Sequence, residues 1–497
     1  MAQLTGNFTG TEAADNFSGS ITQDDITFGP GAVTAAAVKQ VIIDTLGGAD
    51  TIEANTSFFA VPDIDAVGMT NADINTGAGA DKVNVVSDIN SVNAGISTAL
   101  QNSFIETDTG RDSVTVSNSA NANFDSATGT GARLATVDTG AGQDTIQIDS
   151  VSVDSQAEGR AESSDIGIDQ STLVGGAGQD TITVNSSARG DSGNGADTNS
   201  TGAKGQSNVR GGDGSDRITV TATANGENAI ATSSTATASG ISDGSFVEGG
   251  NGADTITLSA LAKGGVTFGT FPEVEGALTK AYGAINGNVL GGNGKDTITI
   301  TGANETGGSS PDSEAYGVLN TNVDGGGGSD TIRIKASGSA EAFGSTRNGA
   351  KGSNIKGGLG SDTIDISVDA ASGVGTSVGA LSTTIDGGGG ADTIKTRGLK
   401  LDIQDSLILG GGGKDTFDTG AGSGTILGGA GNDLLKLDFF DAATMSIQQA
   451  GADGIRITGS ADKTGAATNW VQEVFEVESY EVAGTSYSAA DVVGLLS

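Results

Sequence analysis

The sequence predicts an all-β protein, a right-handed parallel β-solenoid. The first observation is an internal repeat: an aspartate with Gly two residues before it and an apolar residue two residues after it recurs thirteen times, at steps of 18 to 42 residues. The second is the alternation of apolar and polar residues that follows each aspartate. A period in the thirties indicates stacked supersecondary units instead of independent domains. The aspartates are Asp50, Asp81, Asp112, Asp144, Asp180, Asp216, Asp254, Asp296, Asp330, Asp362, Asp392, Asp415 and Asp433.

Each unit contains a strand and a tight turn, numbered here from its aspartate. Asp180-Thr181-Ile182-Thr183-Val184 is typical: β-branched residues alternate with a period of two, which predicts a strand. Glycines before the aspartate supply a sharp turn. Position +2 is always apolar and position −7 always aliphatic. We therefore expect these two positions to form internal columns of stacked coils and reject disorder for the central region.

The rhythm divides the chain into three parts. Residues 41–437 are expected to form about 13 solenoid coils, with about 30 to 42 residues in most of them. Residues 1–40 are interpreted as an N-terminal cap or docking segment, and 438–497, which carry most of the remaining aromatic residues, as a C-terminal β-cap. The long returns at 185–207 and 261–287 are consistent with extra strands or with loops.

Composition excludes several functions. The net charge is −37, with 24 Lys and Arg against 61 Asp and Glu, so binding of nucleic acid by counterion release is not expected. The chain has no Cys and no His, which removes thiol and imidazole catalysis and the usual zinc, copper and haem sites. No apolar run is long enough to predict a membrane span, and the N-terminus does not resemble a cleavable signal peptide.

The remaining chemistry is that of oxygen ligands, which suits calcium. Stacked coils would place the thirteen aspartates in one file, about 4.8 Å apart. Each adjacent pair of carboxylates would then repel by about 3 kcal/mol at an effective dielectric constant of about 20. Divalent cations between successive turns, bound by carboxylates and by carbonyls of the glycine turns, would cancel this repulsion. We expect up to about 12 calcium ions. The alternative for any single aspartate is a residue that caps its own turn without metal.

The segment Gly175-Gly176-Ala177-Gly178-Gln179-Asp180-Thr181-Ile182 resembles the calcium-binding repeat of the repeats-in-toxin (RTX, haemolysin-type) family. Nine units, from the one at Asp180 to the one at Asp433, match as fully. The resemblance implies a calcium-stapled β-roll, type I secretion and folding on meeting calcium outside the cell. The turn glycines assigned to these sites are Gly176, Gly178, Gly212, Gly214, Gly250, Gly252, Gly292, Gly294, Gly326, Gly328, Gly358, Gly360, Gly388, Gly390, Gly411, Gly413, Gly429 and Gly431.

The chain also departs from the family pattern. Family repeats run in tandem, whereas most coils of this chain contain one motif each. We therefore expect a wider solenoid with calcium turns along one edge. The first four units replace the leading glycine at position −5 with Thr45, Thr76, Thr107 and Thr139. Two of them also lack the glycine at position −4, where Leu46 and Asp108 stand. The sites at Asp50 and Asp112 are therefore the weakest predictions, although Asp44, Asn75, Glu106 and Asp138 precede these four turns.

The C-terminal tail resembles the uncleaved signal of type I secretion substrates. Glu473, Glu476, Glu478 and Glu481 precede a short apolar end at Val492-Val493-Gly494-Leu495-Leu496. The same residues could instead belong only to the cap, and both interpretations can hold.

These observations favour a secreted, extracellular structural protein that self-assembles through calcium into a surface layer, filament or matrix. The expected partners are other copies of the chain, the type I secretion machinery and cell-surface polysaccharide. A calcium-stiffened adhesin is the alternative; an ice-binding solenoid with Thr-x-Thr strands is less favoured. A polysaccharide-modifying enzyme would use acid pairs such as Asp24/Asp25 or Asp402/Asp405. We expect no enzyme, because the solenoid has almost no Trp or Tyr to form sugar platforms.

Overall fold

The computed structural model describes most of the chain. The described residues are 4–11, 13–22, 33–61, 64–92, 94–123, 126–155, 161–190, 196–226, 235–264, 278–306, 313–338, 345–370, 375–437, 439, 441, 443–451, 453–493 and 495. They lie almost entirely in β-strands, and the chain divides into two compact units. Unit 1 comprises Met1–Ala281 with Asn304–Ser310, and unit 2 comprises Tyr282–Ala303 with Pro311–Ser497.

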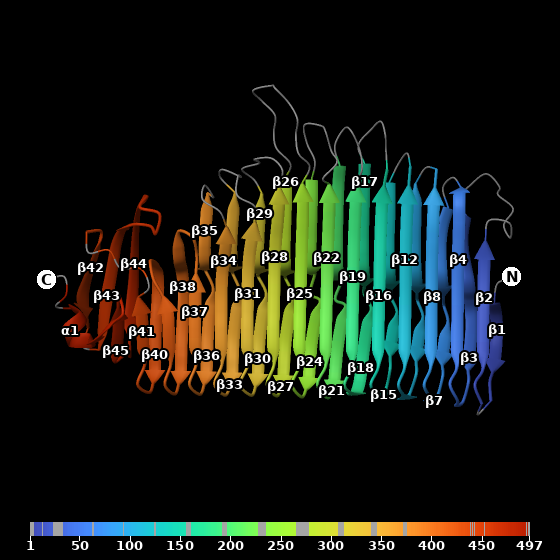
Figure 1. Ribbon diagram of the computed structural model, residues 1–497, viewed down its shortest axis with the longest axis horizontal. Coiled ribbons are helices and arrows are strands. Elements are labelled where there is room, and N and C mark those ends of the chain that lie inside the picture. Colours follow the sequence, from blue (N-terminus) through green and yellow to red (C-terminus); the bar gives the residue numbers. More distant parts are fainter. Residues whose placement is uncertain are drawn as a thin grey trace, which may run out of the picture. The chain divides into compact units, whose positions relative to one another are not determined.

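Unit 1 contains two parallel sheets. The first is formed by the strands that follow the aspartates, each paired in parallel with the next over up to ten residues. Figure 1 shows these strands side by side and pointing the same way. They are β2 (Asn16–Thr22), β4 (Thr51–Val61), β8 (Lys82–Ser91), β12 (Ser113–Ala122), β16 (Thr145–Asp154), β19 (Thr181–Gly190), β22 (Arg217–Gly226) and β25 (Thr255–Gly264).

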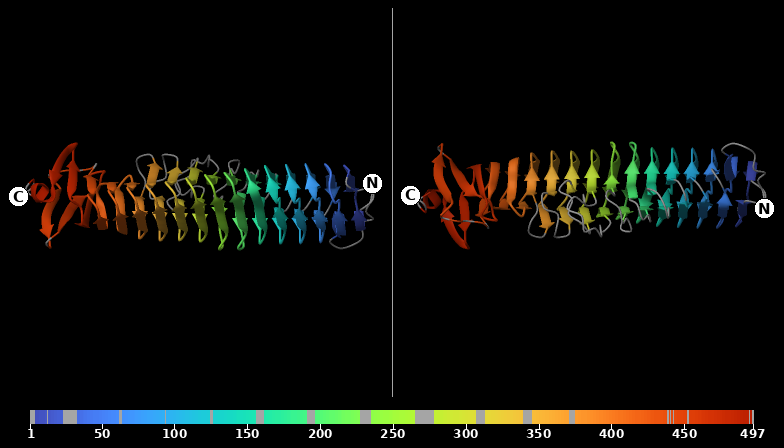
Figure 2. Two further views of the ribbon diagram at one scale, coloured as in Figure 1. Left: turned by 90° about the horizontal axis from the view of Figure 1, so that it is seen from below. Right: turned by 90° about the horizontal axis from the view of Figure 1, so that it is seen from above.

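The second sheet of unit 1 is formed by the returning part of each coil. A corner residue with positive φ, such as Asn102 or Gln170, divides this part in two, and the glycine turn then leads back to the first sheet. Figure 2 shows the two layers of strands. The strands are β1 (Leu4–Thr9), β3 (Val33–Asp44), β5 (Ile64–Thr70), β6 (Asp73–Asn75), β7 (Ala78–Gly79), β9 (Gly95–Gln101), β10 (Phe104–Glu106), β11 (Thr109–Gly110), β13 (Ser126–Arg133), β14 (Thr136–Asp138), β15 (Ala141–Gly142), β17 (Ala161–Asp169), β18 (Thr172–Gly178), β20 (Ala196–Lys204), β21 (Asn208–Asp213), β23 (Thr235–Ile241) and β24 (Phe246–Asn251).

Unit 2 repeats this arrangement, and β26 (Leu278–Ile285) and β28 (Thr297–Thr306) each contain residues of both units. Its aspartate-led strands pair in parallel from β31 onward. They are β31 (Thr331–Gly338), β34 (Thr363–Ala370), β37 (Thr393–Arg397), β39 (Thr416–Thr419) and β41 (Leu434–Leu437). The returning strands are β27 (Asn288–Asn293), β29 (Glu314–Leu319), β30 (Asn322–Gly327), β32 (Thr346–Lys351), β33 (Asn354–Leu359), β35 (Thr376–Leu381), β36 (Thr384–Gly389), β38 (Leu401–Gly412) and β40 (Gly422–Ala430).

The core confirms the two predicted columns, and the parallel β-solenoid with them. Every residue at position +2, from Ile52 to Leu435, and every residue at position −7, from Ile43 to Ile426, is at most 1% exposed. The strand register places equivalent residues opposite each other, as in Val114↔Ile146 and Ile182↔Ile218. A shared register therefore buries one apolar residue per coil on each of two internal lines.

The long returns contain strands at both ends. In the return at 185–207, β19 continues to Gly190 and β20 begins at Ala196. In the return at 261–287, β25 ends at Gly264 and β26 begins at Leu278. The segments between, 191–195 and 265–277, lie outside the described residues.

Antiparallel pairing begins after β41. β40 pairs in parallel with β44 (Ala467–Phe475), which pairs antiparallel with β43 (Gly454–Ala461), and β43 pairs with β42 (Met445–Ala450) in the same way. β41 pairs in parallel with β45 (Ser479–Val482), which forms an antiparallel hairpin with β46 (Thr485–Ser488). Helix α1 (Ala489–Val493) has five residues, and no helix in the described ranges is long and apolar enough to cross a membrane.

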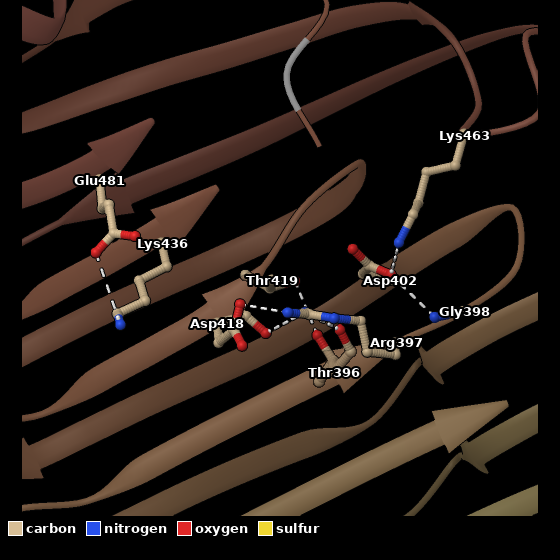
Figure 3. Close-up of polar contacts among 9 residues, drawn as sticks. All are labelled: Thr396, Arg397, Gly398, Asp402, Asp418, Thr419, Lys436, Lys463 and Glu481. Atoms are coloured by element: carbon tan, nitrogen blue, oxygen red, sulfur yellow. Dashed lines mark hydrogen bonds and ion pairs between the residues drawn. The ribbon is translucent and has the colours of Figure 1, made fainter. Parts of the chain in front are cut away.

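Ion pairs join these antiparallel strands to the coils (Figure 3). Lys463 Nζ lies 2.9 Å from Oδ1 of Asp402, a fully buried residue whose Oδ1 also accepts from the Gly398 N–H at 2.9 Å. Lys436 on β41 pairs with Glu481 on β45, whereas Arg397 and Asp418 form an ion pair between two coil strands, β37 and β39. Asp405 is exposed, whereas Asp402 is fully buried, and Asp24 and Asp25 lie outside the described residues.

Removing the lysine from the buried pair is expected to loosen the C-terminal strands. Lys463→Met should lower the free energy of unfolding by about 3 kcal/mol, because it leaves the Asp402 carboxylate buried with fewer compensating charges. Urea unfolding followed by fluorescence of Trp470, the single tryptophan and buried on β44, measures it. The double variant Asp402→Leu with Lys463→Met should recover most of the loss. A double variant as unstable as Lys463→Met would contradict this role of the pair.

Candidate metal centre

The glycine turns place all thirteen aspartates at the start of the first-sheet strands. In one example, β18 ends at Gly178, Asp180 follows two residues later, and β19 begins at Thr181. All thirteen aspartates are at most 2% exposed. Burial of so many carboxyl groups requires compensating interactions within each unit.

One compensating interaction is a ladder of hydrogen bonds between coils. In unit 1, the backbone N–H of Asp180 donates to Oδ1 of Asp216 at 2.8 Å, and the same bond links each aspartate from Asp50 to its successor as far as Asp254. In unit 2 the bonds continue from Asp296 to Asp433 at 2.7–2.8 Å. These aspartates thus cap the backbone of the preceding coil. The alternative in which an aspartate serves only as a turn residue predicts a bond within the aspartate's own turn instead.

The ladder has two members that the motif did not reveal. The Asp15 N–H donates to Oδ1 of Asp50 at 2.7 Å, and the Asp433 N–H donates to Oε2 of Glu478 at 2.7 Å. Asp15 has a glycine at −5 and Phe17 at +2, as expected of a decayed repeat, but Ala13 replaces the glycine at −2. Glu478 has only the aromatic Tyr480 at +2, which pairs with Leu435. The side chains of three tail glutamates have partners in the structure: Glu478 bonds to the Asp433 N–H, Glu473 pairs with Arg456, and Glu481 pairs with Lys436.

The second carboxylate oxygen is different. In the glycine turns, Oδ2 is buried and has no hydrogen-bond partner among the described residues. This holds for Asp180, Asp216, Asp330, Asp362, Asp392, Asp415 and Asp433, and the Oδ2 atoms of Asp50, Asp81, Asp112 and Asp144 in the threonine turns are buried without a partner as well. A buried, unsatisfied carboxylate oxygen is costly and calls for an unrepresented ligand or a proton.

A space lies beside the Oδ2 atom in the glycine turns because the glycine at position −5 has no Cβ atom to fill it. A Cβ atom on Gly175 would lie 2.8 Å from Oδ2 of Asp180 and 2.7 Å from the carbonyl oxygen of Gly211 in the next coil. On Gly357 the corresponding distances are 2.6 Å to Asp362 Oδ2 and 2.5 Å to the Gly387 oxygen. Two oxygens from successive coils therefore face one space, which we call the glycine cradle.

The assigned turn glycines are required by the backbone. At position −4 their φ lies between +94° and +117°, and at position −2 between +122° and +157°, conformations that side chains with a Cβ rarely adopt. A Cβ at position −2 would also overlap a carbonyl oxygen of the preceding coil, as Gly413 would with Gly390.

Burial raises the pKa of several carboxyl groups in the file of aspartates. It raises the pKa of the Asp216 and Asp392 carboxyls to about 7, and that of Asp112 and Asp144 to about 6. Neighbouring aspartates in the file add to the rise, while the N–H bond from the preceding coil opposes it. The buried carboxyl groups of the file therefore retain their protons to a higher pH than isolated aspartates do.

The cradles fit a hard cation that uses mostly carbonyl ligands. No group of three or more carboxylates that could hold a metal occurs among the described residues, so carboxylates alone cannot form the site. Each cradle offers one buried Oδ2 and one carbonyl oxygen. Calcium binds oxygen ligands of these two types at distances of about 2.3–2.6 Å. Asp50, Asp81, Asp112 and Asp144 lie in the same file, but threonine replaces the cradle glycine in their turns.

The polar residues before the threonine turns stabilise the turns themselves. Asn75 Oδ1 accepts from the Gly77 N–H at 2.9 Å, and Asp138 Oδ1 from the Gly140 N–H at 3.1 Å. Each bond spans two residues, as in an Asx turn. These two side chains act as turn caps.

The sequence matches no model of a known protein family and no curated protein.

Proposed function

We propose that the chain is a secreted calcium-dependent structural protein whose solenoid self-assembles outside the cell into a surface layer, filament or matrix. The observation that carries the calcium part is the row of glycine cradles, in which a buried Oδ2 without a donor faces a carbonyl oxygen of the next coil. A cation in each cradle would join two coils and neutralise the file.

The assembly part is supported by the first strands of unit 1. Among the described strands, β1 pairs only with β3, and β2 only with β4. Their outer edges present backbone N–H and C=O groups that can pair with another chain. Export by a type I system, attachment to cell-surface polysaccharide and the absence of catalysis belong to the same proposal and rest on the sequence.

Calcium is expected to control both folding and assembly. Purified protein in chelator should show weak β-sheet circular dichroism, and millimolar calcium should restore a strong β signal. Electron microscopy of the same samples should then show ordered filaments or sheets only with calcium. A β-sheet signal identical in chelator and calcium would contradict the metal part. A calcium-folded protein that stays monomeric would contradict assembly and favour an adhesin.

A further inference from the structure

The turns at Asp144 and Asp180 form a natural pair for comparison. Thr139-Gly140-Ala141-Gly142-Gln143-Asp144 and Gly175-Gly176-Ala177-Gly178-Gln179-Asp180 differ only in their first residue. Their strands pair in register, Ala141 with Ala177 and Gly142 with Gly178. Any difference between the two turns therefore originates at position −5 or in the neighbouring coils.

The backbone of the two turns differs. Gly140 has φ +75°, within the left-handed helical region, whereas Gly176 has φ +101°. Gly178 has φ +143°, whereas the φ of Gly142 lies outside the range of +20° to +160°. Two other threonine turns have no glycine at position −4. Leu46 and Asp108 stand there instead, with φ +66° and +61°, values that residues other than glycine can adopt. This explains why those two positions tolerate side chains.

The threonine hydroxyl replaces part of what a cation would provide. Thr139 Oγ1 donates to the carbonyl oxygen of Gly175 at 2.9 Å, and Thr45 Oγ1 donates to that of Thr76 at 2.7 Å. Thr107 makes the same bond to Thr139 at 3.2 Å. This carbonyl is the equivalent of the one that faces the glycine cradle. All four threonines are fully buried.

We propose that the threonine turns at Thr45, Thr76, Thr107 and Thr139 are metal-free, and that calcium binds in unit 1 only from the Gly175 turn onward. This inference rests on the proposed calcium function and deepens it. The Thr Cβ occupies the cradle, and in three of the four turns the hydroxyl satisfies the carbonyl oxygen that a cation would otherwise bind. The coils from Asp50 to Asp144 would therefore stack without calcium.

A reciprocal exchange between the paired turns tests the proposal. Thr139→Gly gives the Asp144 turn the sequence of the Asp180 turn and is expected to add one tightly bound calcium per chain. Gly175→Thr makes the opposite change and should remove one. Tightly bound calcium is counted by equilibrium dialysis of the full chain with radioactive calcium. Circular dichroism in calcium checks that each variant folds.

The control is Gly412→Ala, at a turn position where a Cβ meets nothing within 4 Å; its calcium count should equal that of the wild type. An unchanged count in Thr139→Gly would overturn the inference while leaving the calcium function in place. This variant introduces only space and decides the question even if Gly175→Thr fails to fold. A wild type that binds no calcium would overturn both proposals.

Hydrogen exchange of the wild type gives an independent result. In chelator, β8, β12 and β16, which follow threonine turns, should retain protected amides, whereas β19 and β22, which follow glycine turns, should lose protection. Equal loss along all five strands, in a protein that regains protection with calcium, would overturn the inference but not the calcium function.

Discussion

Gly413→Ala is expected to destabilise unit 2 by about 3 kcal/mol or more. Gly413 has φ +142°, and its Cβ would overlap the carbonyl oxygen of Gly390 in the preceding coil. Neither atom can move without shifting the backbone of a whole turn. Urea unfolding followed by Trp470 fluorescence, with calcium present, measures the effect.

The neighbouring Gly412 is the matched control for this measurement. A Cβ there meets nothing within 4 Å, so Gly412→Ala should change the free energy of unfolding by no more than about 0.5 kcal/mol. Similar losses in the two variants would show that glycine composition, and not the close approach of successive coils, sets the stability of the turn.

The pH dependence of stability is expected to have opposite signs with and without calcium. In chelator, the free energy of unfolding should fall as the pH rises from about 4 to about 7. Burial raises the folded-state pKa of Asp216 and Asp392 to about 7 from an ordinary 3.8, so the folded state binds more protons than the unfolded state over this range. Their contribution is fully present below the ordinary pKa and is lost as the pH passes the folded one.

Calcium should reverse this slope. The ion binds the deprotonated carboxylate and competes with protons, so stability in calcium should rise over the same pH range. Each unit of pKa shift corresponds to about 1.4 kcal/mol, so the effect summed over the file is large. Urea midpoints across this pH range, in chelator and in calcium, measure both slopes.

Asp392→Asn is the control for the two slopes. Its side-chain oxygen can still accept from the Asp362 N–H, but the residue no longer titrates, so both slopes should become shallower. Parallel slopes in chelator and in calcium would contradict cation binding in the file.

The repeat, and with it the solenoid fold, can be predicted from the amino-acid sequence alone. An apolar residue at +2 and at −7 of every unit is sufficient to define two internal columns, because a one-residue slip would expose all of them. The glycine at position −2 is also evident in the sequence of every unit. It is required because backbone segments that are far apart in the chain approach each other closely at this position.

The use of each carboxylate oxygen follows from the stacking of the coils. Oδ1 bonds to the N–H of the previous coil, and Oδ2 faces the cradle, because stacking brings together residues 18 to 38 positions apart. Asp15 and Glu478 joined the ladder without the full motif, since position in the stack, not local sequence, supplies their donors. The sequence predicts calcium at all four threonine turns, least strongly at Asp50 and Asp112. The hydroxyl bonds that three of these turns make to the next coil depend on how the coils stack.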